Sequence, residues 1–248
     1  MSRVLLVTGA SRGIGAATAR LAAARGYAVC VNYRANRDAA DAVVRDVEAA
    51  GARAVAVAAD IGVEADVLRL FETCDRTLGV PYGLVNNVGI VDLQSRLDAM
   101  TAERITRMFT TNVIGPFLCA REAVRRMSTR HGGAGGAIVN VSSRASGLGS
   151  PGEYIDYAAS KGAIDTMTIG LAREVAEEGI RVNAVRAGHI YTGLHALGGE
   201  PGRVDRVKEG VPMKRGGTAE EVATAILWLL SDEASYTTGA FLDVSGGR

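Results

Sequence analysis

Two residues of this sequence could exchange a proton with a substrate, Tyr157 and Lys161. They stand four positions apart, about one turn along the same face of a helix. A nearby ammonium favours the phenolate and lowers the pKa of a tyrosine. We therefore predict Tyr157 as a general acid/base for a carbonyl being reduced or an alcohol being oxidised. By itself the pair could also be a surface pair on a helix. Tyr154 is a weaker candidate, because Ala158 occupies the position four residues after it.

A glycine-rich turn near the start of the chain is the second candidate site. Residues 4–7 are apolar, Thr8–Gly15 reads TGASRGIG, and an alanine-rich stretch continues to about Arg25. A strand, a glycine-rich turn and a helix in this order direct backbone N–H groups at a phosphate. The GxxxGxG spacing differs from the GxGxxG fingerprint, so the loop alone is a moderate signal, since glycine-rich turns also simply connect elements.

Apolar strands and amphipathic helices alternate along the whole chain, with no repeat and no linker. This order predicts an α/β fold, a single doubly wound (Rossmann-like) parallel sheet of about seven strands with helices on both faces. We expect one domain, 1–248, in which the irregular segment 188–217 forms a substrate-binding lid. The expected strands are 4–7, 28–33, 53–59, 82–86, 137–141, 181–185 and 241–244. The expected helices are the alanine-rich stretch that ends near 25, the ranges 38–50, 64–78, 101–127 and 157–178, and a stretch that begins at 218.

Composition narrows the function classes. Of the 248 residues, 48% are hydrophobic and only 5% aromatic, which suits helices packed on a parallel sheet. A formal net charge of +1 gives no sign of the basic surface that binds nucleic acid. The three cysteines lack metal-ligand spacing, so we expect reduced thiols and no metal site. The sequence shows no signal peptide and no apolar run long enough for a membrane span, which predicts a cytoplasmic protein.

Taken together, the motifs resemble the short-chain dehydrogenase/reductase (SDR) family over essentially the whole chain. The motifs are TGASRGIG at 8–15, NNVG at 86–89, Asn112, Ser142-Ser143, YAASK at 157–161, RVNAVRAG at 181–188 and a Gly-Gly near the end. One YxxxK is weak evidence, whereas this ordered set is highly specific. The stretch 149–154 resembles a bacterial branch labelled glucose 1-dehydrogenase-like or simply oxidoreductase.

The resemblance implies a role for each matching residue. Tyr157 is the general acid/base, Lys161 lowers its pKa and binds the nicotinamide ribose, and Ser143 rather than Ser142 binds the substrate oxygen. Asn112 holds a water that links Lys161 to solvent; on the residues alone it could be a tolerated or capping asparagine inside a helix. The cofactor-binding positions implied are Gly9, Ser11, Arg12, Gly13, Ile14, Gly15, Arg34, Asp60, Ile61, Asn87, Val88, Gly89, Tyr157, Lys161, Ile190 and Thr192.

Several residues leave the family pattern or have no role in it. Val88 adds bulk where alanine is common, and Ala187 replaces a usual proline, which should loosen the turn before Ile190 and Thr192. His189 and His195 lie in the expected lid; we favour solvated loop residues, and contact with substrate is the alternative. The roles of Glu153 and Tyr154 stay open.

The end of the second strand predicts the cofactor. An NAD-preferring member of the family would carry aspartate at Tyr33, where this chain has no acid, and Arg34 follows. Arg12 supplies a second cation, and guanidinium groups bind a 2′-phosphate through charge-assisted hydrogen bonds. We therefore expect NADP(H), with NAD(H) possible if both arginines are solvated.

Two function classes follow, together with an assembly. The first is an NADP(H)-dependent oxidoreductase of a small carbonyl or secondary alcohol; the second is a non-catalytic NADP(H)-binding regulatory module on the same fold. The intact set of catalytic positions favours the enzyme. The resemblance also implies a homotetramer, for which apolar residues on the long helices could serve: Met108, Val113 and Leu118, or Ile226 and Leu229.

Overall fold

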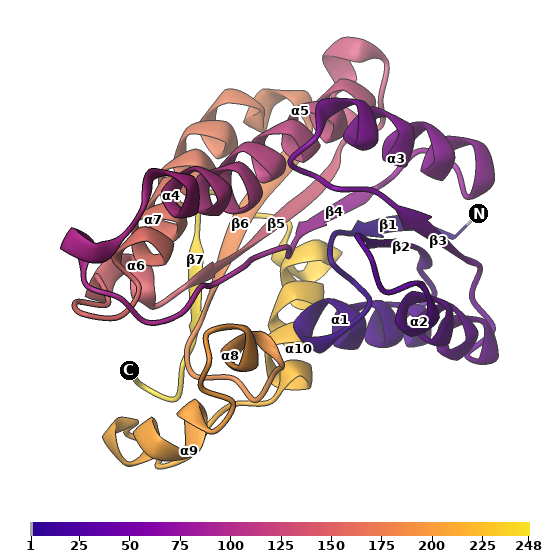
Figure 1. Cartoon of the computed structure of the whole chain (residues 1–248). Helices are drawn as coiled ribbons and strands as arrows, with labels where there is room; N and C mark the ends of the chain where they lie inside the picture. The colour runs from indigo at the N-terminus through magenta and orange to yellow at the C-terminus, as the bar shows by residue number, and fades with distance from the viewer. Residues whose placement is uncertain (1) are drawn as a thin grey trace.

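A single parallel sheet organises the chain. The computed structural model describes residues 2–248, and its seven strands lie in the order β3-β2-β1-β4-β5-β6-β7 (Figure 1). The strand order reverses between β1 and β4, so a crevice opens at the carboxyl ends of these strands. The strands are β1 (Val4–Val7), β2 (Ala28–Tyr33), β3 (Ala54–Ala58), β4 (Gly83–Asn86), β5 (Gly136–Ser143), β6 (Ile180–Ala187) and β7 (Phe241–Val244).

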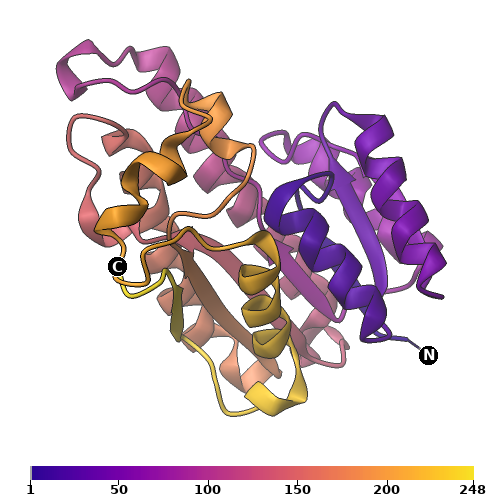
Figure 2. The ribbon, with the colours of Figure 1, turned by 90° about the horizontal axis from the view of Figure 1, so that it is seen from below.

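Helices cover both faces of the sheet. Alternate residues of β1 point to opposite sides, so Leu5 and Val7 join one buried cluster while Val4 and Leu6 join the other. The first cluster packs under α1 (Gly13–Ala24), α2 (Arg37–Ala49) and α10 (Ala219–Leu230), and Figure 2 shows α1 and α10 side by side on this face. The opposite layer contains α3 (Glu64–Thr77), α4 (Ala102–Phe109), α5 (Gly115–Met127) and α7 (Ile155–Glu174).

The helix expected over 101–127 is present, but its hydrogen-bond pattern changes in the middle. A π-helical turn, Thr110–Ile114, separates α4 from α5, and the Gly115 N–H bonds back to the Thr110 carbonyl. Pro116 follows and has no N–H to donate to the residue four positions earlier, Asn112, so the regular ladder is interrupted there. The asparagine therefore lies in a local distortion rather than in a regular helix.

Strands β5 and β6 run further than expected, to the edge of the crevice. Ser142 and Ser143 belong to β5, and Ser143 pairs with Ala187. Ala187 in turn pairs with Val244 of β7, and the Gly188 N–H donates to the Val244 carbonyl at 2.9 Å. The expectation that alanine at 187 loosens this turn is wrong, because the sheet holds the segment on both sides.

The segment 188–217 leaves the sheet and crosses the crevice. It contains two short helices, α8 (Leu194–Leu197) and α9 (Arg203–Val207), below the strand ends in Figure 1. A bridge between Ile190 and Gly217 joins its two ends. Across the crevice another short helix, α6 (Ala145–Leu148), follows β5. Among residues 2–248, no helix has the length and apolarity that crossing a membrane would need.

Candidate active site

One cavity connects the glycine-rich turn with Tyr157. It has a volume of about 650 Å³ and lies at the carboxyl ends of the strands. Residues of the turn line one end, and residues of α6, α7 and the lid line the other. Most predicted site residues line it: Gly9, Ser11, Arg12, Gly13, Ile14, Arg34, Asp60, Ile61, Asn87, Val88, Gly89, Ser143, Tyr157, Lys161, Ile190 and Thr192. Gly15 and Asn112 stand behind this wall.

Tyr157 and Lys161 meet inside the molecule rather than on its surface. Helix α7 places the Lys161 ammonium 5.7 Å from the centre of the Tyr157 ring. The Lys161 Nζ donates to the Val141 carbonyl of β5 at 2.8 Å, and only 4% of the residue is exposed. Gly89 lies on the other side of the ammonium, where a Cβ would come within 3.4 Å of Nζ. The lysine is thus fixed between β5 and the loop after β4.

Burial controls the protonation of both groups. Burial lowers the pKa of Lys161 to about 8, while the charge of Asp165 acts to raise it. Burial also raises the pKa of Tyr157, and the Ser143 hydroxyl acts in the opposite direction. The expected depression of the tyrosine pKa is therefore not seen; burial outweighs the groups that act to lower it. Its hydroxyl is neutral at pH 7, in the form that donates a proton.

The two serines at the end of β5 point to different partners. Ser142 is buried, and its hydroxyl donates to Asp165 Oδ1 at 2.6 Å. Ser143 is partly exposed to the cavity and lies near Tyr157, with its Oγ accepting from the Ala145 N–H at 3.1 Å. Both serines line the cavity, but the Ser142 hydroxyl is taken up by Asp165, so the geometry is compatible with Ser143 as the serine that meets a substrate oxygen, which stays a prediction.

Asn112 ties the distorted helix to the wall of the cavity. Its Oδ1 accepts from the Ile90 N–H at 2.8 Å, and its Nδ2 donates to the Ile90 carbonyl at 3.0 Å and to Ser160 Oγ at 3.2 Å. The side chain therefore joins the π-helical turn to both the loop after β4 and helix α7. This explains why an asparagine is needed there; its link to Lys161 through a water stays a prediction.

The glycine-rich turn is shaped to approach a ligand closely. Gly9 and Gly13 have φ angles of +61° and +54°, which favour glycine. A Cβ on Gly15 would come within 2.6 Å of the Gly9 carbonyl and of Asn87 Nδ2. Helix α1 therefore starts close against the turn, with its first N–H groups toward the cavity, an arrangement that fits a pyrophosphate. Val88 packs against Gly9, with its Cγ2 at 3.0 Å from where a Cβ would lie.

Two buried side chains that we did not single out hold this turn. Asn32 accepts from the Gly9 N–H through Oδ1 at 3.1 Å and donates from Nδ2 to the Ala59 carbonyl at 3.0 Å. Thr8 Oγ1 accepts from the Asn87 N–H at 2.9 Å. A buried polar residue within an apolar strand was the available signal, because such a group must find partners inside the fold.

The end of the crevice where we expected adenosine carries two arginines and one acid. Arg34 and Asp60 lie across from each other with Nη1 and Oδ2 3.8 Å apart, and the Arg34 side chain is 66% exposed. Asp60 Oδ1 also accepts from the Gly62 N–H, and Ile61 is buried against Gly115. Arg12 lines the same end. Both arginines that we expected near a 2′-phosphate line the cavity, and Asp60 lies close enough to Arg34 to compete with a phosphate for it.

The segment 188–217, the expected lid, is joined to the loop before α7 by an ion pair in which the Glu153 side chain stays 30% exposed. Arg203 of α9 forms a two-pronged pair with Glu153, with Nη1 and Oε1 3.1 Å apart, and its guanidinium lies 5.1 Å from the centre of the Tyr154 ring. His189 and His195 are half-buried and line the cavity, which favours the alternative, contact with a substrate, over a purely solvated position. Burial lowers the pKa of both, that of His189 to about 4.

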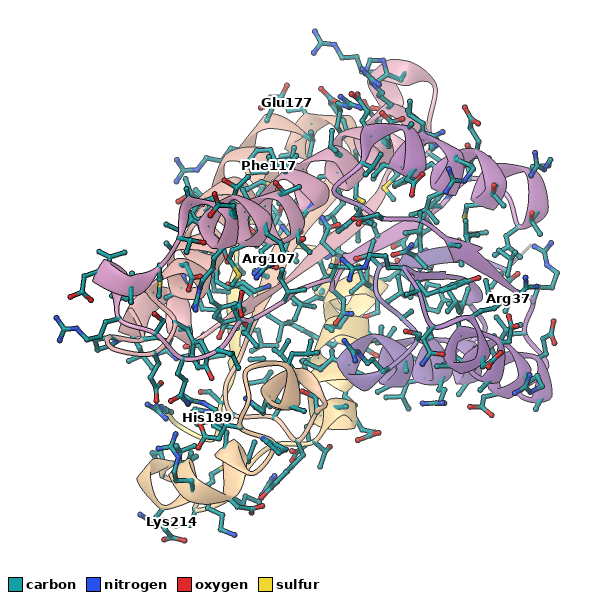
Figure 3. The ribbon with its side chains drawn as sticks, in the orientation of Figure 1. Arg37, Arg107, Phe117, Glu177, His189 and Lys214 are labelled. Carbon is teal, nitrogen blue, oxygen red and sulfur yellow. The ribbon has the colours of Figure 1, made fainter. Side chains whose placement is uncertain are left out.

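The apolar residues expected at a subunit interface and the three cysteines lie outside this cavity. Met108, Ile226 and Leu229 are buried within the chain, so they are not available to an interface between subunits. The exposed apolar side chains on the same layers include Phe117, which is 49% exposed on α5 (Figure 3). The three cysteines are free and buried, and residues 2–248 hold no group of three or more side chains suited to a metal ion.

Comparison with known proteins identifies the family. A family model described as Enoyl-(Acyl carrier protein) reductase matches residues 9–248. The chain is 60% identical over 245 residues to "Uncharacterized oxidoreductase YgfF" of Escherichia coli, covering 99% of each chain. It is 37% identical to "Glucose 1-dehydrogenase 2" of Bacillus subtilis, covering 99% of this chain and 94% of that one.

A solved structure gives the same answer. A short-chain type dehydrogenase/reductase from Mycobacterium marinum superposes with a TM-score of 0.92 at 32% identity, covering 99% of this chain and 94% of that chain. The whole-chain match agrees with the strand order, the glycine-rich turn and the buried tyrosine and lysine described above. The chain belongs to the short-chain dehydrogenase/reductase family of oxidoreductases, whose members use NAD(P) cofactors.

Proposed function

We propose that the protein transfers a hydride between NADP(H) and a small carbonyl compound or secondary alcohol. The observation that carries the proposal is the continuous cavity that joins the phosphate-binding turn to Tyr157 and Ser143. When bound there, the nicotinamide supplies or accepts the hydride. The chain's own groups then have to bind the substrate oxygen, supply its proton and exclude water.

The residues around Tyr157 divide this work. In the reducing direction, the neutral Tyr157 hydroxyl donates its proton to the oxygen that becomes an alcohol, and in the oxidising direction its phenolate takes the proton back. The Ser143 hydroxyl donates to the same oxygen as negative charge develops on it. The pKa of Lys161 is about 8, so at lower pH its ammonium adds a positive charge beside the phenolate.

Turnover separates this proposal from a cofactor-binding module without chemistry. Reduced cofactor is mixed with a panel of ketones, aldehydes, sugars, ketoacyl thioesters, steroids and quinones, and its absorbance is followed in both directions. Reaction with one panel member that is lost in Tyr157→Phe supports the proposal. Tight binding of NADPH with no turnover on the whole panel would favour the module.

We further propose NADP(H) over NAD(H), on the two arginines at the adenosine end. Arg12 and Arg34 both line the cavity, and Tyr33 stands where an aspartate would repel a phosphate. A charge-assisted hydrogen bond is worth about 1.5–3 kcal/mol, so each arginine would add about tenfold to a hundredfold selectivity, and the competing Asp60 carboxylate should keep the contribution of Arg34 near the lower figure.

The test compares kcat/KM for NADPH and NADH on one substrate. We expect wild-type protein to prefer NADPH and Arg34→Ala to lose part of that preference. Asp60→Asn should increase it, because the carboxylate no longer competes for Arg34. A wild-type preference for NADH, or an unchanged ratio in Arg34→Ala, contradicts the placement of the phosphate.

The proposed assembly is a homotetramer. Two-fold packing of the layer that contains α5 and α7 would cover Phe117, Ile114 and Ile169, which are 49%, 49% and 39% exposed. Light scattering at micromolar concentration should give four times the chain mass, and Phe117→Glu should reduce it. A wild-type monomer under these conditions would exclude the tetramer.

A further inference from the structure

Three arginines line the substrate end of the cavity, and two of them are already neutralised. Arg144 Nη1 lies 2.8 Å from Asp243 Oδ2. Arg203 is paired with Glu153 and also reaches Glu200 Oε2 at 3.2 Å. These two cations therefore have partners before any substrate enters, and Glu153 has no charge left to offer a cationic substrate.

The third arginine, Arg248, differs from the other two. Within residues 2–248 its guanidinium forms no ion pair with a carboxylate, and its Nη1 contacts Nε2 of His189 instead. His189 lies two residues after the end of β6, whose last residue, Ala187, accepts from the Ser143 hydroxyl at 3.5 Å. Figure 3 shows His189 at the start of the lid segment. The guanidinium of Arg248 therefore contacts a residue close in the chain to the strand end that holds Ser143, and both arginine and serine line the same cavity.

His189 is suited to hold this guanidinium without neutralising it. Burial, and after it the charge of Arg248, lower the pKa of the imidazole to about 4, so the ring is neutral at pH 7. A neutral imidazole offers one acceptor nitrogen. It contacts one N–H of Arg248 and leaves the remaining N–H groups of the guanidinium for a ligand.

The backbone keeps Arg248 in place. Gly246 and Gly247 have φ angles of +64° and +92°, so the chain turns sharply after β7 and returns toward the cavity. The main-chain oxygen of Arg248 then accepts from Arg144 Nε at 2.7 Å and from Ser245 Oγ at 2.9 Å. A charge positioned in this way costs less to order on binding than one on a free tail.

We propose that Arg248, supported by His189, binds a carboxylate on the substrate, so that the protein acts on small oxo acids and hydroxy acids. This inference rests on the proposed oxidoreductase function and specifies its substrate class. A guanidinium matches the geometry of a carboxylate and binds it through two parallel N–H···O bonds. The substrate's carbonyl then reaches Ser143 and Tyr157 while its acid group stays at Arg248.

Matched acid and ester pairs test the assignment. We would measure kcat/KM for 2-oxobutanoate and 4-oxopentanoate against their methyl esters, at saturating cofactor. We expect the better acid to exceed its ester by about tenfold to a hundredfold, the effect of one charge-assisted contact. Arg248→Gln should bring this ratio close to one, and Arg248→Lys should leave an intermediate ratio. Arg45→Gln, a surface change of equal charge on α2, should keep the wild-type ratio.

Two results would overturn the inference: esters reduced as well as acids by the wild type, or an acid preference that survives in Arg248→Gln with an unchanged melting temperature. If neither acids nor esters react, calorimetry with the unreactive pentanoate and cofactor-loaded protein decides. Binding that is lost in Arg248→Gln keeps the carboxylate site and counts against the proposed reaction. No binding of pentanoate removes the site itself.

Discussion

The floor of the cavity and its lid are held by different forces. On the floor, β5 and α7 are joined by buried hydrogen bonds such as Asn140 Nδ2 to Thr168 Oγ1 at 2.9 Å. On the lid, Arg206 of α9 pairs with Glu200 at 2.9 Å while 53% of its side chain stays exposed. The difference matters because water and salt weaken exposed ion pairs and hardly affect buried contacts.

This contrast divides function between the two regions. The groups that move a proton need fixed distances, and the buried floor provides them. The lid has to admit and release substrate, and contacts that water can replace allow it to open. We therefore expect changes on the floor to affect kcat and folding, and changes on the lid to affect KM.

The largest expected effect comes from the floor. Tyr157→Phe removes the transferable proton and should lower kcat by about a hundredfold to ten-thousandfold, while the affinity for cofactor stays within about twofold. Lys161→Ala should reduce both, because the ammonium also faces the cofactor end. Steady-state rates and titration of cofactor fluorescence measure the two quantities. Near-normal turnover by Tyr157→Phe would remove the tyrosine from its role.

Ion pairs of the buried layer and of the lid should contribute differently to stability. Arg104 and Asp156 form a nearly buried ion pair that joins α4 to the start of α7, with Nε and Oδ2 2.8 Å apart and side chains 11% and 2% exposed. Arg104→Ala leaves Asp156 unpaired and should lower the free energy of unfolding by about 3–5 kcal/mol. Arg206→Ala on the lid should cost less than about 1 kcal/mol. Urea denaturation of both variants measures this; equal losses would show that the two regions do not differ.

The pH dependence tests the charge beneath Tyr157. The pKa of Lys161 is about 8, and Asp165 acts to raise it. As pH rises through this value the ammonium is lost, so kcat should fall on the alkaline side. Asp165→Asn should lower the lysine pKa, move this limb to lower pH and reduce kcat at pH 8 by about two- to fivefold. An unmoved alkaline limb in Asp165→Asn would assign that limb to another group.

A similarly small effect is expected of salt on the lid. Raising the ionic strength to about 0.5 M should weaken the exposed pairs of Arg206 with Glu200 and Glu153 and raise the KM for substrate about two- to fivefold. The value of kcat at saturating substrate and cofactor should change little. Arg206→Ala should remove part of this salt dependence. A fall in kcat with constant KM would place the salt-sensitive step on the floor instead.

Much of the fold could be predicted because its signals are local. The strands 4–7, 28–33 and 241–244 were predicted with the observed bounds, and the Thr218–Glu221 capping box starts α10 as expected. The π-helical turn at Thr110–Ile114 was not predicted, although the sequence contains Pro116. A proline near the start of a helix and one that disturbs the middle of a longer helix look alike in sequence. The ranges predicted for β5 and β6 were too short, because pairing with neighbouring strands extends both strands.

The sequence by itself determined the family, the parallel sheet and the residues available for chemistry, since Tyr157, Lys161, Ser143 and the glycine-rich turn follow short-range patterns. The tertiary structure decided their state. Burial, which no local pattern reports, lowers the pKa of Lys161, keeps Tyr157 neutral and turns Ser142 toward Asp165. Contacts between residues far apart in the chain also bring His189 and Arg248 together at the cavity, and only the folded chain sets such contacts.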